Sequence, residues 1–169
     1  MTKPRFSLIP QFSFRSITDV TPEFLEQKGI EFLMLDLDNT LAAYDEHVLA
    51  EDVSKWVDDI QANGTKLFLI SNSTRTKRVE SFANHIGVDY IMKSYKPSPK
   101  SLVRAMELTG FSSGVSALAG DQIMTDTLAA NRAGVLSIVV RPRRLTNLFL
   151  SFRYRLEVPL RALCKNKNH

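Results

Sequence analysis

Short apolar runs alternate with amphipathic segments along most of the chain. The runs contain few polar residues, as expected for strands that are buried on both faces of a sheet. Between them, apolar residues recur at intervals of three and four, the spacing of one helix face. The pattern predicts strands at residues 30–36, 65–70, 88–92, 115–119 and 135–140.

The ends of the predicted helices are marked by capping residues. Thr21-Pro22 and Ser98-Pro99 are typical helix starts, and a glycine follows the last apolar position of several helices. We expect helices that run from Thr21 to Gly29, through Val53–Ile60 to Gly64, through Val79–Ile86 to Gly87, from Ser98 to Gly110, and from Thr125 to Ala133. Strands alternating with helices predict an α/β fold, a three-layer αβα sandwich of Rossmann type around a central parallel sheet.

Length and composition agree with a single globular domain. The chain has 169 residues, of which 44% are hydrophobic and 24% are charged. We expect one domain over residues 1–169, with a core at about 30–141 and a C-terminal segment at 142–169. One cysteine, Cys164, excludes an internal disulfide and leaves no disulfide partner. The N-terminal residues lack the continuous apolar core of a signal peptide, so we expect a cytoplasmic protein.

The charge is divided unevenly between the body and the C-terminal segment. The net charge is +4, and residues 141–169 contain eight Lys or Arg against one Glu, which gives 8 − 1 = +7 and leaves 4 − 7 = −3 for the rest. A basic end of this kind indicates an anionic partner: a membrane surface, nucleic acid or an acidic protein. A merely solvated basic end is the alternative.

The C-terminal segment also carries an apolar stripe at helical spacing. Pro159 is expected to kink this helix, and Arg153, Arg155 and Arg161 lie elsewhere on its circumference. Two interpretations stay open, because the stripe could pack on its own domain or lie in the interface of an anionic membrane. The stripe consists of Leu145, Leu148, Phe149, Phe152, Leu156, Leu160 and Leu163.

Polar side chains follow the predicted strands, at the point where each strand ends. Loops at the carboxyl ends of parallel strands converge on one crevice, so these side chains should share a cleft although they are far apart in sequence. They are Asp36, Asp38 and Thr40 after the first strand, Ser71 and Asn72 after the second, Lys96 after the third, and Asp121 and Asp126 after the fourth.

These residue types suit phosphoryl transfer. A carboxylate can attack phosphorus and form an acyl phosphate that water then hydrolyses. Several carboxylates in one cleft repel one another and a phosphate unless a hard cation such as Mg²⁺ lies among them. A lysine adds compact positive charge, and a serine hydroxyl with nearby N–H groups can hold the phosphoryl oxygens.

The motifs resemble those of the haloacid-dehalogenase-like superfamily, in the correct order. Asp36-Leu37-Asp38-Asn39-Thr40 is similar to its DxDxT signature, and Gly120-Asp121 to Asp126 is similar to its GDxxxxD motif. The resemblance implies Asp36 as nucleophile and Asp38 as general acid/base. It further implies catalysis and substrate binding by Lys96, and substrate binding by Thr40, Ser71 and Asn72. The Mg²⁺ ligands that it implies are Asp36, Asp38 through its backbone carbonyl, Asp121 and Asp126, and an alternative role for Asp126 is to orient Lys96.

No cap domain fits between the second and third motifs, because Ser71 and Lys96 are about 25 residues apart. Capless members of the superfamily resemble enzymes whose substrates are macromolecular or surface-bound, because a cleft without a cap is open to a bulky group. Over nearly the whole chain the sequence is similar to the bacterial YqeG group of capless phosphatases, which is related to phosphatidylglycerophosphate phosphatases. The resemblance therefore implies a Mg²⁺-dependent phosphatase acting on phosphatidylglycerophosphate, a membrane phospholipid.

Other readings of the function stay open. A soluble phosphatase of a small metabolite or phosphoprotein is one alternative, and a nucleic-acid-associated module with an inherited site is another. Nucleic acid is the weaker partner, because the basic end lacks interleaved aromatic residues for base stacking. We interpret Arg75, Lys77 and Arg78 as the solvated face of a helix. His47 and His85 have no partner pattern and receive no catalytic role.

Overall fold

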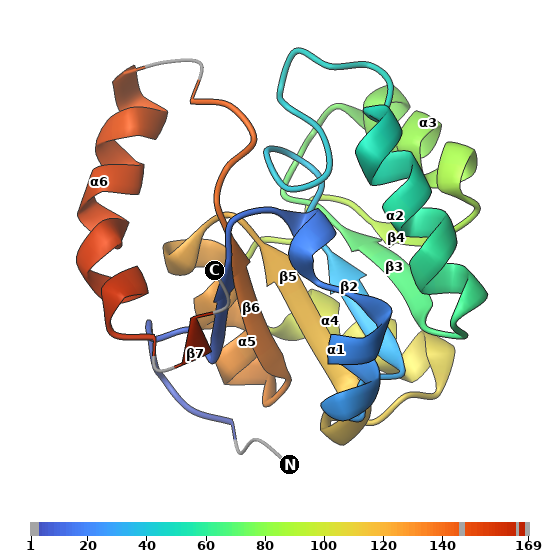
Figure 1. Cartoon of the computed structure of the whole chain (residues 1–169), viewed down its shortest axis with the longest axis horizontal. Helices are drawn as coiled ribbons and strands as arrows, with labels where there is room; N and C mark the ends of the chain where they lie inside the picture. Colours follow the sequence, from blue (N-terminus) through green and yellow to red (C-terminus); the bar gives the residue numbers. More distant parts are fainter. Residues whose placement is uncertain (1–3, 146–147, 165, 168–169) are drawn as a thin grey trace.

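The chain forms a seven-stranded parallel sheet with helices on both faces (Figure 1). The computed structural model describes residues 4–145, 148–164 and 166–167. Within those ranges the strand order is β4-β3-β2-β5-β6-β1-β7. The strands are β1 (Phe12–Phe14), β2 (Phe32–Leu35), β3 (Lys66–Ile70), β4 (Asp89–Ile91), β5 (Ser116–Gly120), β6 (Leu136–Val140) and β7 (Asn166–Lys167).

Helices cover the two faces of the sheet in separate layers, so the predicted three-layer sandwich is confirmed. Leu33 and Leu35 of β2 point to one side, into a core shared with α1 (Pro22–Gln27), α2 (Glu51–Ala62) and α3 (Thr76–Ile86). Phe32 and Met34 point to the other side, toward α4 (Lys100–Thr109) and α5 (Leu128–Ala133). Alternate residues of a strand point to opposite faces, which explains why all four residues of β2 are apolar and buried.

The order of the strands creates a crevice beside β2. The chain runs from β2 through β3 to β4 at one edge, and then returns to place β5 on the other side of β2. Ligands of open parallel sheets bind at the carboxyl ends of the strands where the order reverses, here between β2 and β5. Between Ser71 and Lys96, a fully described segment, the chain forms α3 and β4 and no inserted cap, as predicted.

The sheet extends beyond the predicted core of 30–141. Strand β1 pairs with β6, with Phe12 opposite Ile138, and was not predicted. Its three residues are too few to show an alternating pattern, and its stability comes from a neighbour far away in sequence. The 125–133 helix also differs from the prediction, because a π-helical turn, η3 (Ile123–Thr127), precedes α5. The helix predicted from Ser98 has Pro99 as its N-cap.

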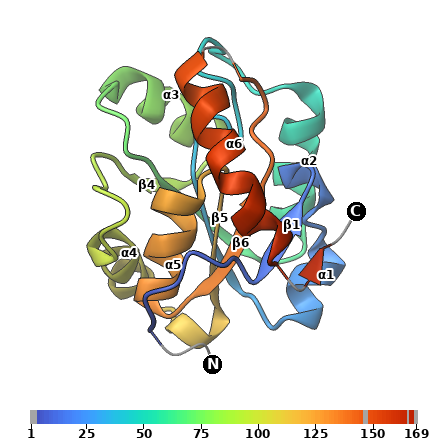
Figure 2. The same ribbon diagram turned by 90° about the vertical axis from the view of Figure 1, so that its left-hand side faces the viewer.

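The C-terminal helix α6 (Leu148–Ala162) lies beside η3 and crosses the outside of the molecule in Figure 2. Four side chains of the predicted apolar stripe are exposed: Leu148 (90%), Phe152 (62%) and Leu156 (61%) on α6, and Leu163 (58%) directly after it. Leu160 is half-buried. The interpretation that the stripe packs on its own domain is therefore wrong for these four side chains. The side chain of Phe149 lies outside the described part of the structure, as does Lys165.

The basic residues of the C-terminal segment are partly neutralised by the body. Arg143 lies 3.7 Å from Asp52, and Arg144 lies 2.8 Å from Asp45. Part of the positive charge of the C-terminal segment is therefore paired with acidic side chains of the body. None of the helices in the described ranges is both long enough and apolar enough to cross a bilayer.

Candidate active site

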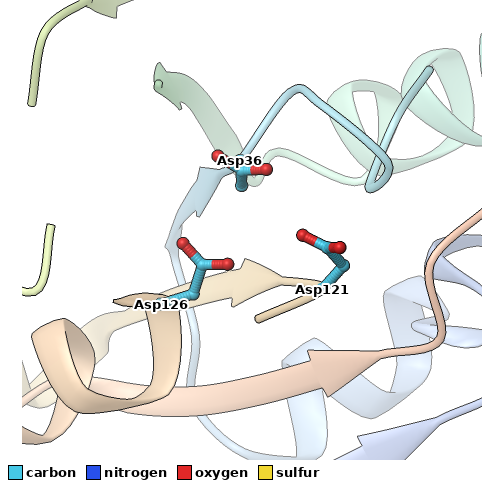
Figure 3. A group of neighbouring side chains, drawn as sticks. All are labelled: Asp36, Asp121 and Asp126. Carbon is cyan, nitrogen blue, oxygen red and sulfur yellow. The ribbon is translucent and has the colours of Figure 1, made fainter. Parts of the chain in front are cut away.

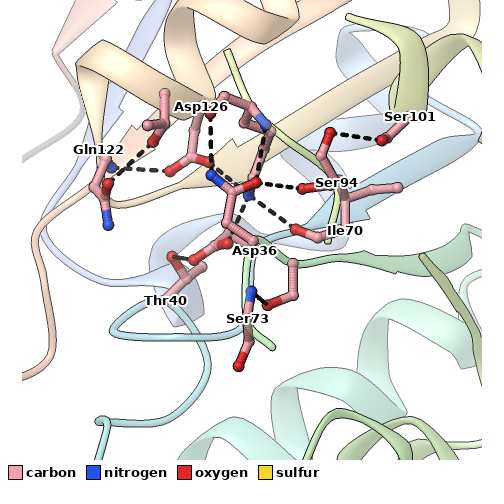
Figure 4. Close-up of polar contacts among 12 residues, drawn as sticks. Asp36, Thr40, Ile70, Ser73, Ser94, Ser101, Gln122 and Asp126 are labelled. Atoms are coloured by element: carbon pink, nitrogen blue, oxygen red, sulfur yellow. Dashed lines mark hydrogen bonds and ion pairs between the residues drawn. The ribbon is translucent and has the colours of Figure 1, made fainter. Parts of the chain in front are cut away.

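A cleft of about 260 Å³ opens at the carboxyl ends of the central strands. It takes in six of the predicted site residues, and Thr40 and Asp121 are buried next to it. Figure 4 shows polar contacts in this region, among them those of Asp36, Thr40, Gln122 and Asp126. The cleft is lined by Asp36, Asp38, Tyr44, Ser71, Asn72, Ser73, Thr74, Arg75, Lys96, Gln122, Thr125 and Asp126.

Lys96 is the centre of the buried polar network. Its Nζ lies 2.6 Å from Asp36 Oδ1 and 2.7 Å from Asp126 Oδ1, and it donates to the Ile70 carbonyl at 2.8 Å. An ammonium group has three N–H donors, so all three are used. Burial by itself would lower the pKa of Lys96, but the carboxylates of Asp126 and Asp36 outweigh it and raise that pKa. Lys96 therefore stays charged and holds Asp36 at the end of β2.

Three buried carboxylates, those of Asp36, Asp121 and Asp126, point toward one another (Figure 3). One oxygen of each lies within 4.8 Å of the others. Burial, with a smaller contribution from the neighbouring acids, raises the pKa of Asp121 well above its usual range. Burial also raises the pKa of Asp36 to about 7, although Lys96 opposes the shift. One lysine does not balance three acids, so the cluster is suited to a cation.

Asp121 offers the best-placed free ligand atom of the three acids. Its Oδ1 is buried and has no hydrogen-bond partner among the described residues. A buried carboxylate oxygen without a donor is costly, and a hard cation with oxygen ligands would satisfy it. The residues present therefore fit a divalent metal ion.

Asp126 is held by the irregular turn that carries it. Its Oδ2 accepts from the Gln122 N–H at 3.0 Å, while Oδ1 faces Lys96. The π-helical turn brings this side chain against Gly120, where an added Cβ would overlap the Asp126 carboxyl group. The glycine before Asp121 is thus required by close packing, and both oxygens of Asp126 are engaged in orienting Lys96 and the loop.

Ser71 and Asn72 shape the other wall of the cleft. Ser71 is buried, and its Oγ accepts from the Ser73 N–H at 3.1 Å. The Asn72 side chain accepts from Ser94 Oγ at 2.6 Å and from the Lys96 N–H at 2.8 Å, and donates to the Lys96 carbonyl at 3.0 Å. Asn72 therefore fixes the backbone that carries Lys96. Sequence reasoning missed Ser94, which precedes a residue of positive φ, Tyr95, in an irregular loop.

The interpretation of Arg78 as a solvated residue is wrong. Its Nη2 lies 3.1 Å from Asp38 Oδ1 and its Nε lies 3.2 Å from the same oxygen. The guanidinium also donates to the Ala43 carbonyl at 2.8 Å and to the Glu46 carbonyl. Arg78 lies on the face of α3 that turns toward the DxDxT loop, whereas Lys77 is exposed as expected.

The remaining predicted residues of the first motif lie close to Asp36. Thr40 is buried, and its Oγ1 donates a long hydrogen bond of 3.4 Å to Asp36 Oδ2. Arg75 lines the cleft and donates to the Tyr44 carbonyl at 3.0 Å, so it too contributes to the site, a role that its position at a helix start did not reveal.

The fold and the acidic cleft define a hydrolase of the α/β type with its active site at the sheet crevice. Residues 8–134 match the family model of the haloacid dehalogenase-like hydrolases, and the chain belongs to this family. Over 162 residues it is 29% identical to the probable phosphatase YqeG of Bacillus subtilis (strain 168), covering 95% of this chain and 94% of that protein. The predicted family and enzyme class, a phosphatase, are confirmed.

Solved structures with low sequence identity support the fold. An uncharacterized protein from Listeria monocytogenes serotype 4b superposes with a TM-score of 0.56 at 14% identity, over 79% of this chain and all of that one (100%). The 3-deoxy-D-manno-octulosonate 8-phosphate phosphatase of Moraxella catarrhalis superposes with a TM-score of 0.51 at 14% identity, over 83% and 92% of the two chains.

Proposed function

We propose that the protein is a Mg²⁺-dependent phosphatase that forms an aspartyl-phosphate on Asp36. The observation that carries this proposal is the convergence of the carboxylates of Asp36, Asp121 and Asp126 at the cleft, where Lys96 pairs with Asp36 and Asp126. Asp36, Asp121 and the backbone carbonyl of Asp38 would hold Mg²⁺, with Asp126 close by. Bound Mg²⁺ would neutralise the carboxylates and stabilise charge on the phosphoryl oxygens.

The residues of the cleft have complementary tasks in this reaction. Asp36 attacks phosphorus, and the bond from phosphorus to the ester oxygen breaks. Asp38 protonates the leaving alcohol and then takes a proton from the water that hydrolyses the aspartyl-phosphate. Lys96 holds Asp36 in place, and Ser71 with the N–H groups of the following loop binds the phosphoryl oxygens.

We propose a lipid phosphate monoester, phosphatidylglycerophosphate, as the substrate. A cleft of about 260 Å³ can take a phosphate group but cannot enclose a phospholipid, whose glycerol and acyl chains must stay outside it. No inserted cap closes the cleft between α3 and α4, a fully described segment, so a bulky group can remain outside. The relative from B. subtilis is a probable phosphatase, in agreement with the reaction class.

The outer face of α6 is the proposed membrane contact. Leu148, Phe152, Leu156 and Leu163 form an exposed apolar row, and Arg155 is exposed beside it. Apolar side chains flanked by arginine suit the interface of an anionic bilayer. Binding at this face would keep the protein peripheral on the membrane that contains its substrate.

The reaction and the substrate are tested by comparing three phosphate monoesters with the full chain. Wild-type protein is assayed on phosphatidylglycerophosphate in anionic vesicles, on a small soluble phosphate ester and on a phosphopeptide, with chelator and with Mg²⁺. Turnover of the lipid should be highest, and chelation should abolish all turnover until Mg²⁺ is restored. Turnover that survives exhaustive chelation would overturn the metal assignment, and a preference for the soluble ester or the phosphopeptide would overturn the lipid assignment.

The membrane contact is tested with a matched pair of substitutions. Phe152→Ser and Leu156→Ser should reduce vesicle binding and lipid turnover and leave soluble-ester turnover unchanged. Leu108→Ser on α4 is the control, because Leu108 is 57% exposed, close to the 61% of Leu156, but lies on another helix. Equal vesicle binding by all three variants and the wild type would exclude this face as the contact.

A further inference from the structure

The inner face of α6 carries a buried pair of charged residues, Glu157 and Arg161. They are only 2% and 8% exposed, whereas the apolar row of the same helix faces outward. Arg161 Nη2 lies 3.4 Å from Glu157 Oε2, one helical turn away. Tyr154, a third residue of this face, stacks its ring under the guanidinium at 4.9 Å. The helix therefore docks on the domain through its polar side.

Both charged groups bind the backbone of the loop that follows β5. The Arg161 guanidinium donates to the Asp121 carbonyl, and its Nη1 donates to the Val140 carbonyl at 2.8 Å. Glu157 Oε1 accepts from the Met124 N–H at 3.2 Å, in the first turn of η3. The pair therefore binds the loop at two points, the carbonyl of Asp121 and the N–H of Met124, which lie on either side of Gln122.

Burying Glu157 and Arg161 costs desolvation free energy. The hydrogen bonds that offset this cost are made to the backbone at the ends of β5 and β6 and in η3. A surface helix docked by apolar residues would avoid the cost altogether. Arg161 connects the ends of β5 and β6 with a planar group that can serve two carbonyls at once. Because the guanidinium fixes the peptide group of Asp121, it also limits the directions that the Asp121 side chain can take.

We propose that Arg161 and Glu157 are positioning residues that hold Asp121 in the geometry required for metal binding. This inference rests on the proposed function, which takes Asp121 as a metal ligand. Partners that orient a metal ligand commonly alter metal affinity 10- to 100-fold when they are removed. The same contacts join the helix with the outward apolar face to the loop that would carry the metal.

The experiment measures Mg²⁺ binding to the full chain by calorimetry and by the Mg²⁺-induced rise in the unfolding temperature. Arg161→Lys keeps a cation near Glu157 but cannot serve both carbonyls, and it should weaken Mg²⁺ binding about tenfold. Arg161→Ala should weaken it further. For the soluble ester, the Mg²⁺ concentration at half-maximal turnover should rise by the same factor, while turnover at saturating Mg²⁺ and the KM for the ester change little.

Two control variants separate this inference from the proposed function. Arg104→Ala removes an arginine whose side chain is 62% exposed on α4, outside both proposed binding surfaces, and should bind Mg²⁺ as the wild type does. Asp121→Asn should lose Mg²⁺ binding. If Asp121→Asn binds Mg²⁺ normally, the metal assignment of the proposed function fails and the inference with it. If Asp121→Asn loses binding while folded Arg161→Lys keeps it, the positioning inference alone is overturned. If neither Arg161 variant folds, the pair contributes to stability and not to metal binding, and the positioning inference is overturned as well.

Discussion

Replacing Arg78 by alanine should damage both the stability and the chemistry of this enzyme. The guanidinium lies between α3 and the DxDxT loop, with a side chain 6% exposed, and its partner Asp38 is 13% exposed. Removing one member of a buried ion pair costs about 3–5 kcal/mol, because the other charge is left without a partner. For a protein of this size that corresponds to a fall of roughly 6–20 °C in Tm.

The effect on turnover follows from the role proposed for Asp38. Without Arg78, the Asp38 carboxylate and the carbonyls of Ala43 and Glu46 lose their shared donor, so the loop is no longer fixed over the cleft. Loss of a general acid/base costs about 10²–10⁴ in rate, and a misplaced one should cost less, about 10- to 100-fold in kcat. Arg78→Lys should recover part of the stability and little of the rate, since lysine cannot reproduce the planar fork.

The assay combines thermal unfolding with turnover of a soluble phosphate ester at saturating Mg²⁺. Lys77→Ala is the control, because Lys77 is the exposed neighbour on the same helix and should change neither quantity. An Arg78→Ala protein with the stability and kcat of the Lys77→Ala protein would refute the reasoning. A loss of stability with unchanged kcat would show that Arg78 stabilises the fold but does not position Asp38 for catalysis.

Three further predictions concern the acidic cluster. Asp36→Asn should abolish turnover without unfolding the protein, because the amide cannot form an acyl phosphate; measurable turnover in the folded variant contradicts this. Since folding raises the pKa of Asp36 from 3.8 to about 7, the metal-free protein binds more protons folded than unfolded in this range. Its stability should fall from pH 4 to pH 7, by at most about 4 kcal/mol for a shift of about three pKa units. Unfolding of wild type and Asp36→Asn in chelator should differ in this slope, and Mg²⁺ should stabilise the wild type more as the pH rises. Gly120→Ala should displace Asp126 from Lys96 and reduce kcat, whereas a fully active variant would show that the loop can relax.

The parts of the fold that the sequence predicts are those determined by local pattern. The run at β2 is apolar at every position because both of its faces are covered, and no other element of that length fits it. The positions of Asp36, Ser71 and Asp121 follow from the same rule, since each comes directly after a strand of a parallel sheet, and Lys96 lies in the loop after β4. The predicted site residues therefore converge without any knowledge of side-chain contacts.

The parts that the sequence does not predict depend on contacts between distant residues. Arg78 lies in the first turn of α3, close in sequence to Arg75 and Lys77. Nothing in the local sequence shows that Arg78, and not one of the other two, turns inward toward Asp38. Strand β1 is stabilised by β6, more than a hundred residues away in the chain. Asn72 lines the cleft, where its predicted substrate binding stays a prediction. Its hydrogen bonds to the loop that carries Lys96 were not predicted, because only the path of that loop reveals them.

The orientation of α6 shows why an amphipathic pattern does not determine which face of a helix is buried. The stripe predicts that one face is apolar, and in most surface helices that face turns inward. Here the Asp121 and Val140 carbonyls and the Met124 N–H lie at the docking site and need polar partners. Leaving such groups buried without hydrogen bonds would cost more than exposing a row of apolar side chains. The polar face is therefore buried because the loop beneath it requires donors and acceptors, and the apolar face is left exposed at the surface that we propose as the membrane contact.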